Sequence, residues 1–62
     1  MNTLEIKLID GSIINIAEEY IWIDEIEKNM NNQLDYIRIY DFIFNKQEIV
    51  YIKLIKEDEK ND

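Results

Sequence analysis

LEIKLIDGSIINI, residues 4–16, is the stretch of sequence that decides the fold. In residues 4–8 apolar side chains alternate with charged ones, which is the two-residue period of a strand with one buried face. Asp10 and Gly11 separate this run from a second apolar run at residues 12–16. Asp-Gly between two such runs is a strong hairpin signal, because Gly tolerates a positive φ angle. An antiparallel β-hairpin is therefore predicted at the start of the chain.

The next segment, residues 16–30, fits two interpretations. Its apolar side chains recur every three or four positions, as on one face of a helix: Ile16, Tyr20, Ile23, Ile26 and Met30. This spacing favours one long helix with a capping-box-like start at Asn15. The alternative is a strand over residues 19–23 followed by a shorter helix that begins at Asp24. The residues expected to end the helix are Asn29, Asn31 and Asn32.

Three more short strands are predicted in the second half of the chain, over residues 36–40, 42–44 and 49–55. In the last of these, Val50, Ile52 and Leu54 are predicted to share the apolar face. Residues 45–48 are polar and have the character of a turn or a single 3₁₀ turn.

The predicted order of elements is β-β-α-β-β-β, an α+β fold with one compact domain over residues 1–55. The strands form either a small SH3-like barrel or an open, barrel-like antiparallel sheet, with one acidic helix. A 3₁₀ turn before the last strand resembles SH3-type barrels, and this resemblance implies the barrel. Residues 56–62 contain no apolar side chain, so we expect a charged, disordered tail.

Composition excludes several classes of function. The 62 residues carry 14 acids and 7 bases, a formal net charge of −7, with one Gly and no Cys, His or Pro. Without Cys there is no disulfide or thiol nucleophile, and without His the commonest general base and metal ligand are missing. One Gly cannot build a phosphate-binding loop. We therefore expect no enzyme, no cofactor and no metal. The N-terminal residues resemble neither a signal peptide nor a membrane anchor, which favours the cytoplasm.

Residues 18–27 form the first candidate site, because they hold five carboxylates and no base. Such a run is an ordinary solvated helix face, or a negative surface that docks on a basic patch of a protein partner. A Trp in the same run is either part of the core or a contact residue for the partner. The predicted partner-binding residues are Glu18, Ile21, Trp22 and Glu25.

The second candidate site is a mixed face of aromatic and basic side chains on the predicted strands. Strand parity places them opposite the apolar positions, and they are Tyr36, Arg38, Tyr40, Tyr51 and Lys53. Rings beside cations suit a nucleotide, a short single strand of nucleic acid or another small anionic ligand. Ordinary cross-strand pairs or a contact between copies of the chain explain the same pattern. The net charge of −7 argues against duplex DNA.

The leading hypothesis is a small, acidic, non-enzymatic protein-interaction module. Small size, acidity and a composition typical of A/T-rich genomes suit a phage or mobile-element protein that inhibits a host nucleic-acid-processing or defence protein. The alternatives are a nucleotide or single-stranded nucleic-acid binder and a homo-oligomeric structural protein. No membrane partner is expected.

Overall fold

The structure is a computed structural model, and it describes residues 1–56. Its elements in chain order are β1 (Asn2–Leu8), β2 (Ile13–Glu18), α1 (Ile23–Met30), β3 (Tyr36–Ile39), β4 (Phe42–Asn45), the 3₁₀ turn η1 (Lys46–Glu48) and β5 (Ile49–Ile55). The α+β class and the predicted element order are confirmed, with the 3₁₀ turn before the last strand. Apart from Lys56, the tail predicted at residues 56–62 lies outside the described residues.

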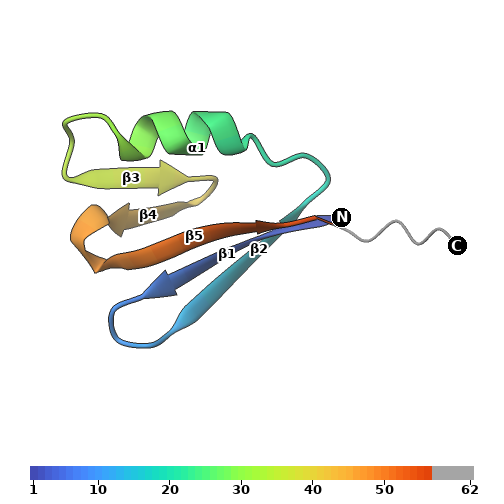
Figure 1. The fold of residues 1–62 in the computed structure, drawn as a ribbon, viewed down its shortest axis with the longest axis horizontal. Coiled ribbons are helices and arrows are strands. Elements are labelled where there is room, and N and C mark those ends of the chain that lie inside the picture. Colours follow the sequence, from blue (N-terminus) through green and yellow to red (C-terminus); the bar gives the residue numbers. More distant parts are fainter. Residues whose placement is uncertain (57–62) are drawn as a thin grey trace, which may run out of the picture.

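The strands divide into two antiparallel sheets. In the part of the chain that the structure describes, one sheet has three strands in the order β2-β1-β5, and the other consists of β3 and β4. Figure 1 shows α1 lying along β3, with the two sheets following below it. Within residues 1–56 no closed barrel forms, because β2 and β3 are joined through α1 and do not pair with each other.

The first hairpin forms as predicted. Leu8 N donates to Ser12 O over 2.9 Å, and Gly11 has a φ angle of 92°, which suits glycine. The Asp10 carboxylate accepts hydrogen bonds from the Ser12 hydroxyl at 2.6 Å and from its backbone N–H at 2.9 Å. These two bonds hold the pKa of Asp10 below its ordinary value.

Both interpretations of residues 16–30 are wrong in part. The second strand continues to Glu18, because Ile16 lies opposite Leu4 in the β1–β2 register and is 7% exposed. Residues 19–22 form neither helix nor strand, and α1 begins at Ile23. The predicted start signals also fail, since the N-cap residue is Trp22 and makes no side-chain capping bond. The shorter helix of the second interpretation is confirmed to within one residue at its start, and it ends before Asn31, one of the predicted stop residues.

The core lies between the two sheets and the helix. Its buried side chains are Leu4, Ile6, Ile16, Ile26, Ile37, Ile39 and Phe44. Alternation in β1 and β3 predicts their apolar faces correctly, and in β5 it holds for Ile52 and Leu54 but fails at Val50. A register shift places Ile49 opposite Leu8 and Tyr51 opposite Lys7, so Val50 is left without a partner on β1. Val50 is 54% exposed, and Ile49 packs against the core in its place.

Candidate functional site

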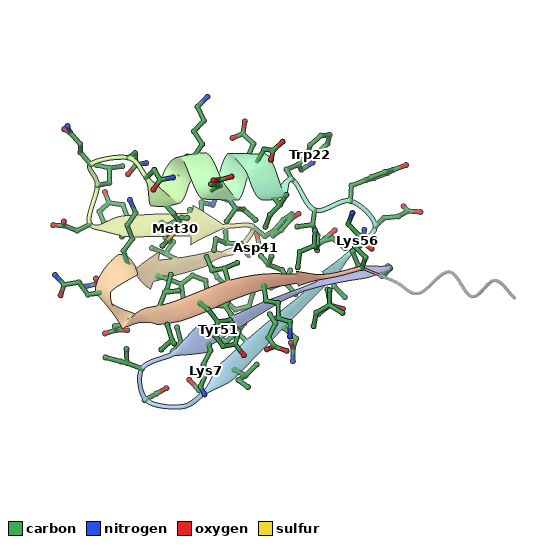
Figure 2. All side chains as sticks on the ribbon, in the orientation of Figure 1. Lys7, Trp22, Met30, Asp41, Tyr51 and Lys56 are labelled. Carbon is green, nitrogen blue, oxygen red and sulfur yellow. The ribbon has the colours of Figure 1, made fainter. Side chains whose placement is uncertain are left out.

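The short connection between β2 and α1 presents two aromatic side chains to solvent. Tyr20 is 73% exposed and Trp22 is 68% exposed. The backbone at this point turns sharply into the helix, with Ile23 N donating to Ile21 O over 3.0 Å. Figure 2 shows the Trp22 ring standing out from the N-terminal end of α1. Trp22 is therefore a surface residue and not part of the core.

Tyr40, in the turn between β3 and β4, connects this segment to the sheet. Its φ angle of 55° is uncommon for a residue other than glycine. Its half-buried ring packs against the core, and its hydroxyl donates to Tyr20 O over 3.1 Å. These two contacts hold the turn in place and fix the position of the segment that carries Trp22.

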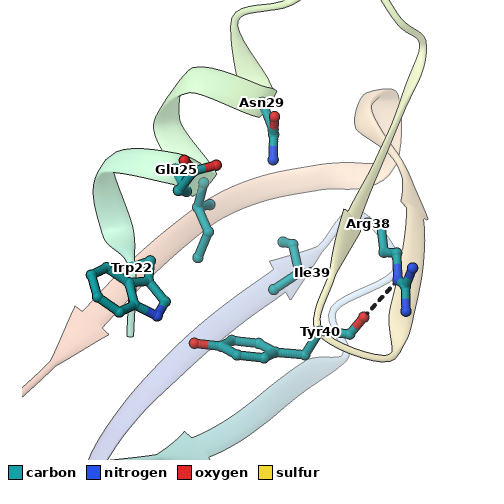
Figure 3. A pocket seen from close by; sticks show the side chains of 7 residues that line it. Trp22, Glu25, Asn29, Arg38, Ile39 and Tyr40 are labelled. Carbon is teal, nitrogen blue, oxygen red and sulfur yellow. Dashed lines mark hydrogen bonds between the residues drawn. The ribbon is translucent and has the colours of Figure 1, made fainter. Parts of the chain in front are cut away.

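A hollow of about 160 Å³ lies between α1 and the end of β3. The residues that line it are Trp22, Glu25, Ile26, Asn29, Arg38, Ile39 and Tyr40. Ile26 and Ile39 are buried and supply an apolar floor. Figure 3 shows the rings of Trp22 and Tyr40 at one end of this hollow and Arg38 at the other. Arg38 Nε donates to Tyr40 O over 2.9 Å, which orients the guanidinium.

A second hollow, of about 210 Å³, continues along β3 toward the loop that follows α1. The residues that line it are Asn29, Asn32, Leu34, Tyr36, Ile37 and Arg38. Hydrogen bonds fix this loop: Lys46 Nζ donates to Asn32 Oδ1 at 2.7 Å, and Leu34 N donates to the same oxygen at 2.9 Å. Asn29 and Arg38 line both hollows. The two hollows together are called the α1–β3 groove below.

The predicted partner-binding residues meet only in part at this groove. Trp22 and Glu25 line its first hollow. Glu18 is exposed at the end of β2, and Ile21 is half-buried against the core, so neither of them lines a hollow.

The predicted mixed face does not exist as one surface. Tyr36 and Arg38 are on β3, whereas Tyr51 and Lys53 are on β5, which belongs to the other sheet. Parity correctly places side chains on opposite faces of one strand but does not tell which strands pair, so the expectation of a shared face is wrong. Tyr40 is in the turn, and its ring packs against the core.

On the outer face of the three-stranded sheet, Tyr51 and Lys53 have ordinary cross-strand neighbours. The Tyr51 hydroxyl donates to Glu5 Oε2 over 2.5 Å, and Lys53 lies opposite Glu5 in the β1–β5 register. The hydrogen bond to the carboxylate raises the pKa of Tyr51 above its ordinary value. This face therefore resembles a solvated sheet surface more than a ligand site.

Several groove residues are not predicted by the sequence analysis: Ile26, Asn29, Asn32, Leu34, Ile37 and Ile39. Asn29 and Asn32 are typical of the end of a helix. The sequence therefore explains them as helix-stop residues and gives no sign that they line a groove. Leu34 is 55% exposed, and its position as an isolated apolar residue in a polar connection is the one sequence signal from which it could have been found.

Within residues 1–56, no group of three or more acidic, His or Cys side chains is placed to hold a metal ion. In the same part of the chain, no helix has the length and apolar character needed to cross a membrane.

Comparison of this chain with protein-family models, with curated proteins and with solved structures gives no match.

Proposed function

We propose that the protein is a non-enzymatic interaction module that binds another protein through the α1–β3 groove. The observation that carries this proposal is the position of Trp22, which is 68% exposed at one end of an apolar hollow. A large aromatic side chain beside an open apolar hollow is typical of the centre of a protein–protein contact. Trp and Tyr gain most from such contacts because they bury a large area with few rotatable bonds.

The charge around Trp22 indicates a basic partner. Residues 18–27 contain five carboxylates, all on exposed residues, and no base. Such a surface accelerates association with a positively charged protein and disfavours acidic competitors. It also imitates the charge of a phosphate backbone. On this basis the partner is a basic nucleic-acid-processing or defence protein of a host cell, and the chain is its phage or mobile-element inhibitor.

The finer class of the fold is part of the same proposal. We infer an opened relative of the SH3-like barrel, in which the β2–β3 pairing is replaced by the connection through α1. The strand order β2-β1-β5 and the 3₁₀ turn between β4 and β5 support this inference. The opening is what leaves room for the groove beside β3.

The test compares two double variants in affinity capture from cells of the source organism, read out by mass spectrometry. The groove variant is Trp22→Ala with Glu25→Lys. The control variant is Tyr51→Ala with Glu48→Lys, which also removes one aromatic ring and reverses one acidic charge, but at residues that do not line the groove. We expect the groove variant to lose the captured protein by about tenfold or more, which corresponds to one hot-spot residue. The control variant should capture as the unchanged chain does.

Circular dichroism and thermal unfolding of both variants complete the test. Since Trp22 and Glu25 are exposed, the groove variant should remain folded. Equal capture by the two variants would contradict the proposal, and so would loss of folding in the groove variant, which would assign Trp22 a structural role.

A nucleotide or single-stranded nucleic-acid ligand is the second candidate, because Arg38 lines both hollows near Tyr36 and Tyr40. Arg38→Ala would then abolish salt-sensitive binding of a nucleotide, whereas Lys53→Ala, on the other sheet, would leave it unchanged. Absence of any nucleotide binding at low salt would exclude this candidate.

A further inference from the structure

The hydrogen-bond pattern of the β3–β4 hairpin shows which backbone groups of β3 are free. Lys46 N donates to Asp35 O over 2.9 Å just beyond the end of the ladder. In an antiparallel pair, hydrogen-bonded and non-hydrogen-bonded positions alternate along each strand. Ile37 and Ile39 are therefore the β3 positions that exchange hydrogen bonds with β4. The N–H and C=O groups of the residues between them point away from β4.

Tyr36 and Arg38 are the β3 residues whose backbone groups face this open edge. Among residues 1–56 the sheet contains β3 and β4 alone, so β3 has no second neighbouring strand in this part of the chain. Within the described residues, no other backbone or side-chain hydrogen bond reaches the backbone N–H or C=O of Tyr36 or Arg38. An edge with unpaired groups is a template on which another extended chain can pair.

The two hollows of the α1–β3 groove lie one after the other along β3. The distance between them matches the distance between residues i and i+2 of a strand. The first hollow touches β3 and its turn at residues 38–40, and the second touches β3 at residues 36–38. They are thus displaced by two residues, which is about 6.6 Å along a strand. Side chains on one face of an extended chain recur at the same interval. The hollows are spaced to receive residues i and i+2 of a strand added beside β3.

We propose, resting on the function proposed above, that the partner binds as an extended segment that adds a strand to the open edge of β3. Two apolar side chains two residues apart occupy the hollows beside Ile39 and Ile37. The residue between them lies opposite Arg38 and exchanges two backbone hydrogen bonds with it. The helix α1 forms the other wall of the groove. Basic residues flank the apolar pair, because Glu25 lines the first hollow and Asp24 and Glu27 are exposed on the same helix.

A helical partner is disfavoured by the same observations. A helix satisfies its own backbone hydrogen bonds, so it would leave the free groups of Tyr36 and Arg38 unpaired. Its anchor side chains would also recur at three or four residues on one face. An extended segment fits both the open edge and the two-residue displacement, whereas a helix fits neither.

Short synthetic peptides test this binding mode directly. The first probe is the blocked pentapeptide Lys-Phe-Thr-Phe-Lys, in which the Phe side chains enter the hollows and Thr lies opposite Arg38. Binding is followed by the fluorescence of Trp22, the only Trp of the chain, whose emission should shift to shorter wavelength as the groove is covered. A second peptide of equal composition, Lys-Phe-Phe-Thr-Lys, has the wrong spacing and should bind about tenfold more weakly or less.

N-methylation of the peptide backbone provides a matched pair of probes. A methyl group on the Thr nitrogen removes the N–H that donates to Arg38, and we expect a loss of affinity of about tenfold or more. A methyl group on the second Phe nitrogen removes an N–H that points away from β3, and affinity should stay within about twofold. Hydrogen exchange at the Arg38 amide should slow when the unmethylated peptide binds.

If both methylated peptides lose the same affinity, edge-strand binding is wrong. It is also wrong if Lys-Phe-Thr-Phe-Lys and Lys-Phe-Phe-Thr-Lys bind with equal affinity. If no peptide binds while Trp22→Ala with Glu25→Lys still abolishes capture of the partner, edge-strand addition is wrong and the interaction function stands. If the groove variant also captures its partner normally, both proposals fail.

Discussion

The hydroxyl of Tyr40 joins the β3–β4 turn to the segment that carries Trp22. It donates to Tyr20 O over 3.1 Å, and replacing it by hydrogen in Tyr40→Phe leaves the ring to pack against the core. The substitution therefore removes one hydrogen bond and little else. We expect it to destabilise the protein and to loosen the Trp22 end of the groove.

The size of the effect follows from the environment of the bond. A hydrogen bond between neutral groups contributes about 0.5–1.5 kcal/mol net to stability. Here the freed carbonyl of Tyr20 belongs to an exposed connection, where water can replace the lost donor. The expected loss is thus in the lower half of that range, about 0.5–1 kcal/mol. For a domain of this size such a loss lowers the melting temperature by about 2–8 °C.

Urea unfolding followed by circular dichroism and by Trp22 fluorescence measures the loss. The matched control is Tyr20→Phe, because Tyr20 contributes its carbonyl to the bond and its side chain is 73% exposed. That control should change the free energy of unfolding by less than about 0.5 kcal/mol. If the two variants are equally stable, the Tyr40 hydroxyl does not tether this segment and the reasoning is refuted.

Three further predictions concern the core, the outer sheet face and assembly. Ile6 is 0% exposed, so Ile6→Ala should cost about 2–5 kcal/mol in urea unfolding. Glu5→Gln should return the raised pKa of Tyr51 toward 10.0, as measured by NMR titration of the ring. The stabilising contribution of this bond is present below the ordinary Tyr pKa and disappears as pH rises through the raised one. If the chain forms a homo-oligomer, light scattering at micromolar concentration gives a mass above 7.6 kDa.

Local sequence patterns were sufficient to predict those elements whose structure is determined by residues close together in the sequence. The alternation of residues 4–8 and the Asp10-Gly11 pair predict the first hairpin correctly, because register in a half-buried strand is strongly specified by its pattern. The 3₁₀ turn and the bounds of β5 are also predicted correctly. In each case the residues that determine the structure are neighbours in the sequence.

Elements that depend on distant partners could not be predicted in this way. Ile16 fits a helical stripe with Tyr20 and Ile23 as well as it fits a strand, and only its pairing with Leu4 decides. The bulge that exposes Val50 is a property of the β1–β5 register and leaves no mark in the β5 sequence itself. Tertiary context overrides local preference at both places.

The candidate site likewise combines residues that the sequence indicates with residues that only the pairing of strands brings together. Trp22 and Glu25 were identified because aromatic and acidic residues in one short run are conspicuous. The pairing of strands then moved Tyr51 to another surface from Tyr36 and Arg38, although all three follow the same alternation. Since a sequence pattern defines a face of one strand only, the groove could not be assembled without the structure.

The features around the groove also depart from what folding alone would favour. The N-cap of α1 is Trp22, which makes no side-chain capping bond, whereas Ser, Thr, Asp or Asn at this position typically contributes about 0.5–2 kcal/mol. Tyr40 has a φ angle of 55°, where Gly or Asn would fold with less strain. Departures from local rules of this kind are typical of functional sites, and at Tyr40 the packing of the ring and the hydrogen bond of its hydroxyl to Tyr20 O hold the turn in place. Because both departures lie at one end of the α1–β3 groove, they support the proposal that the partner binds there and not to the regular outer face of the three-stranded sheet.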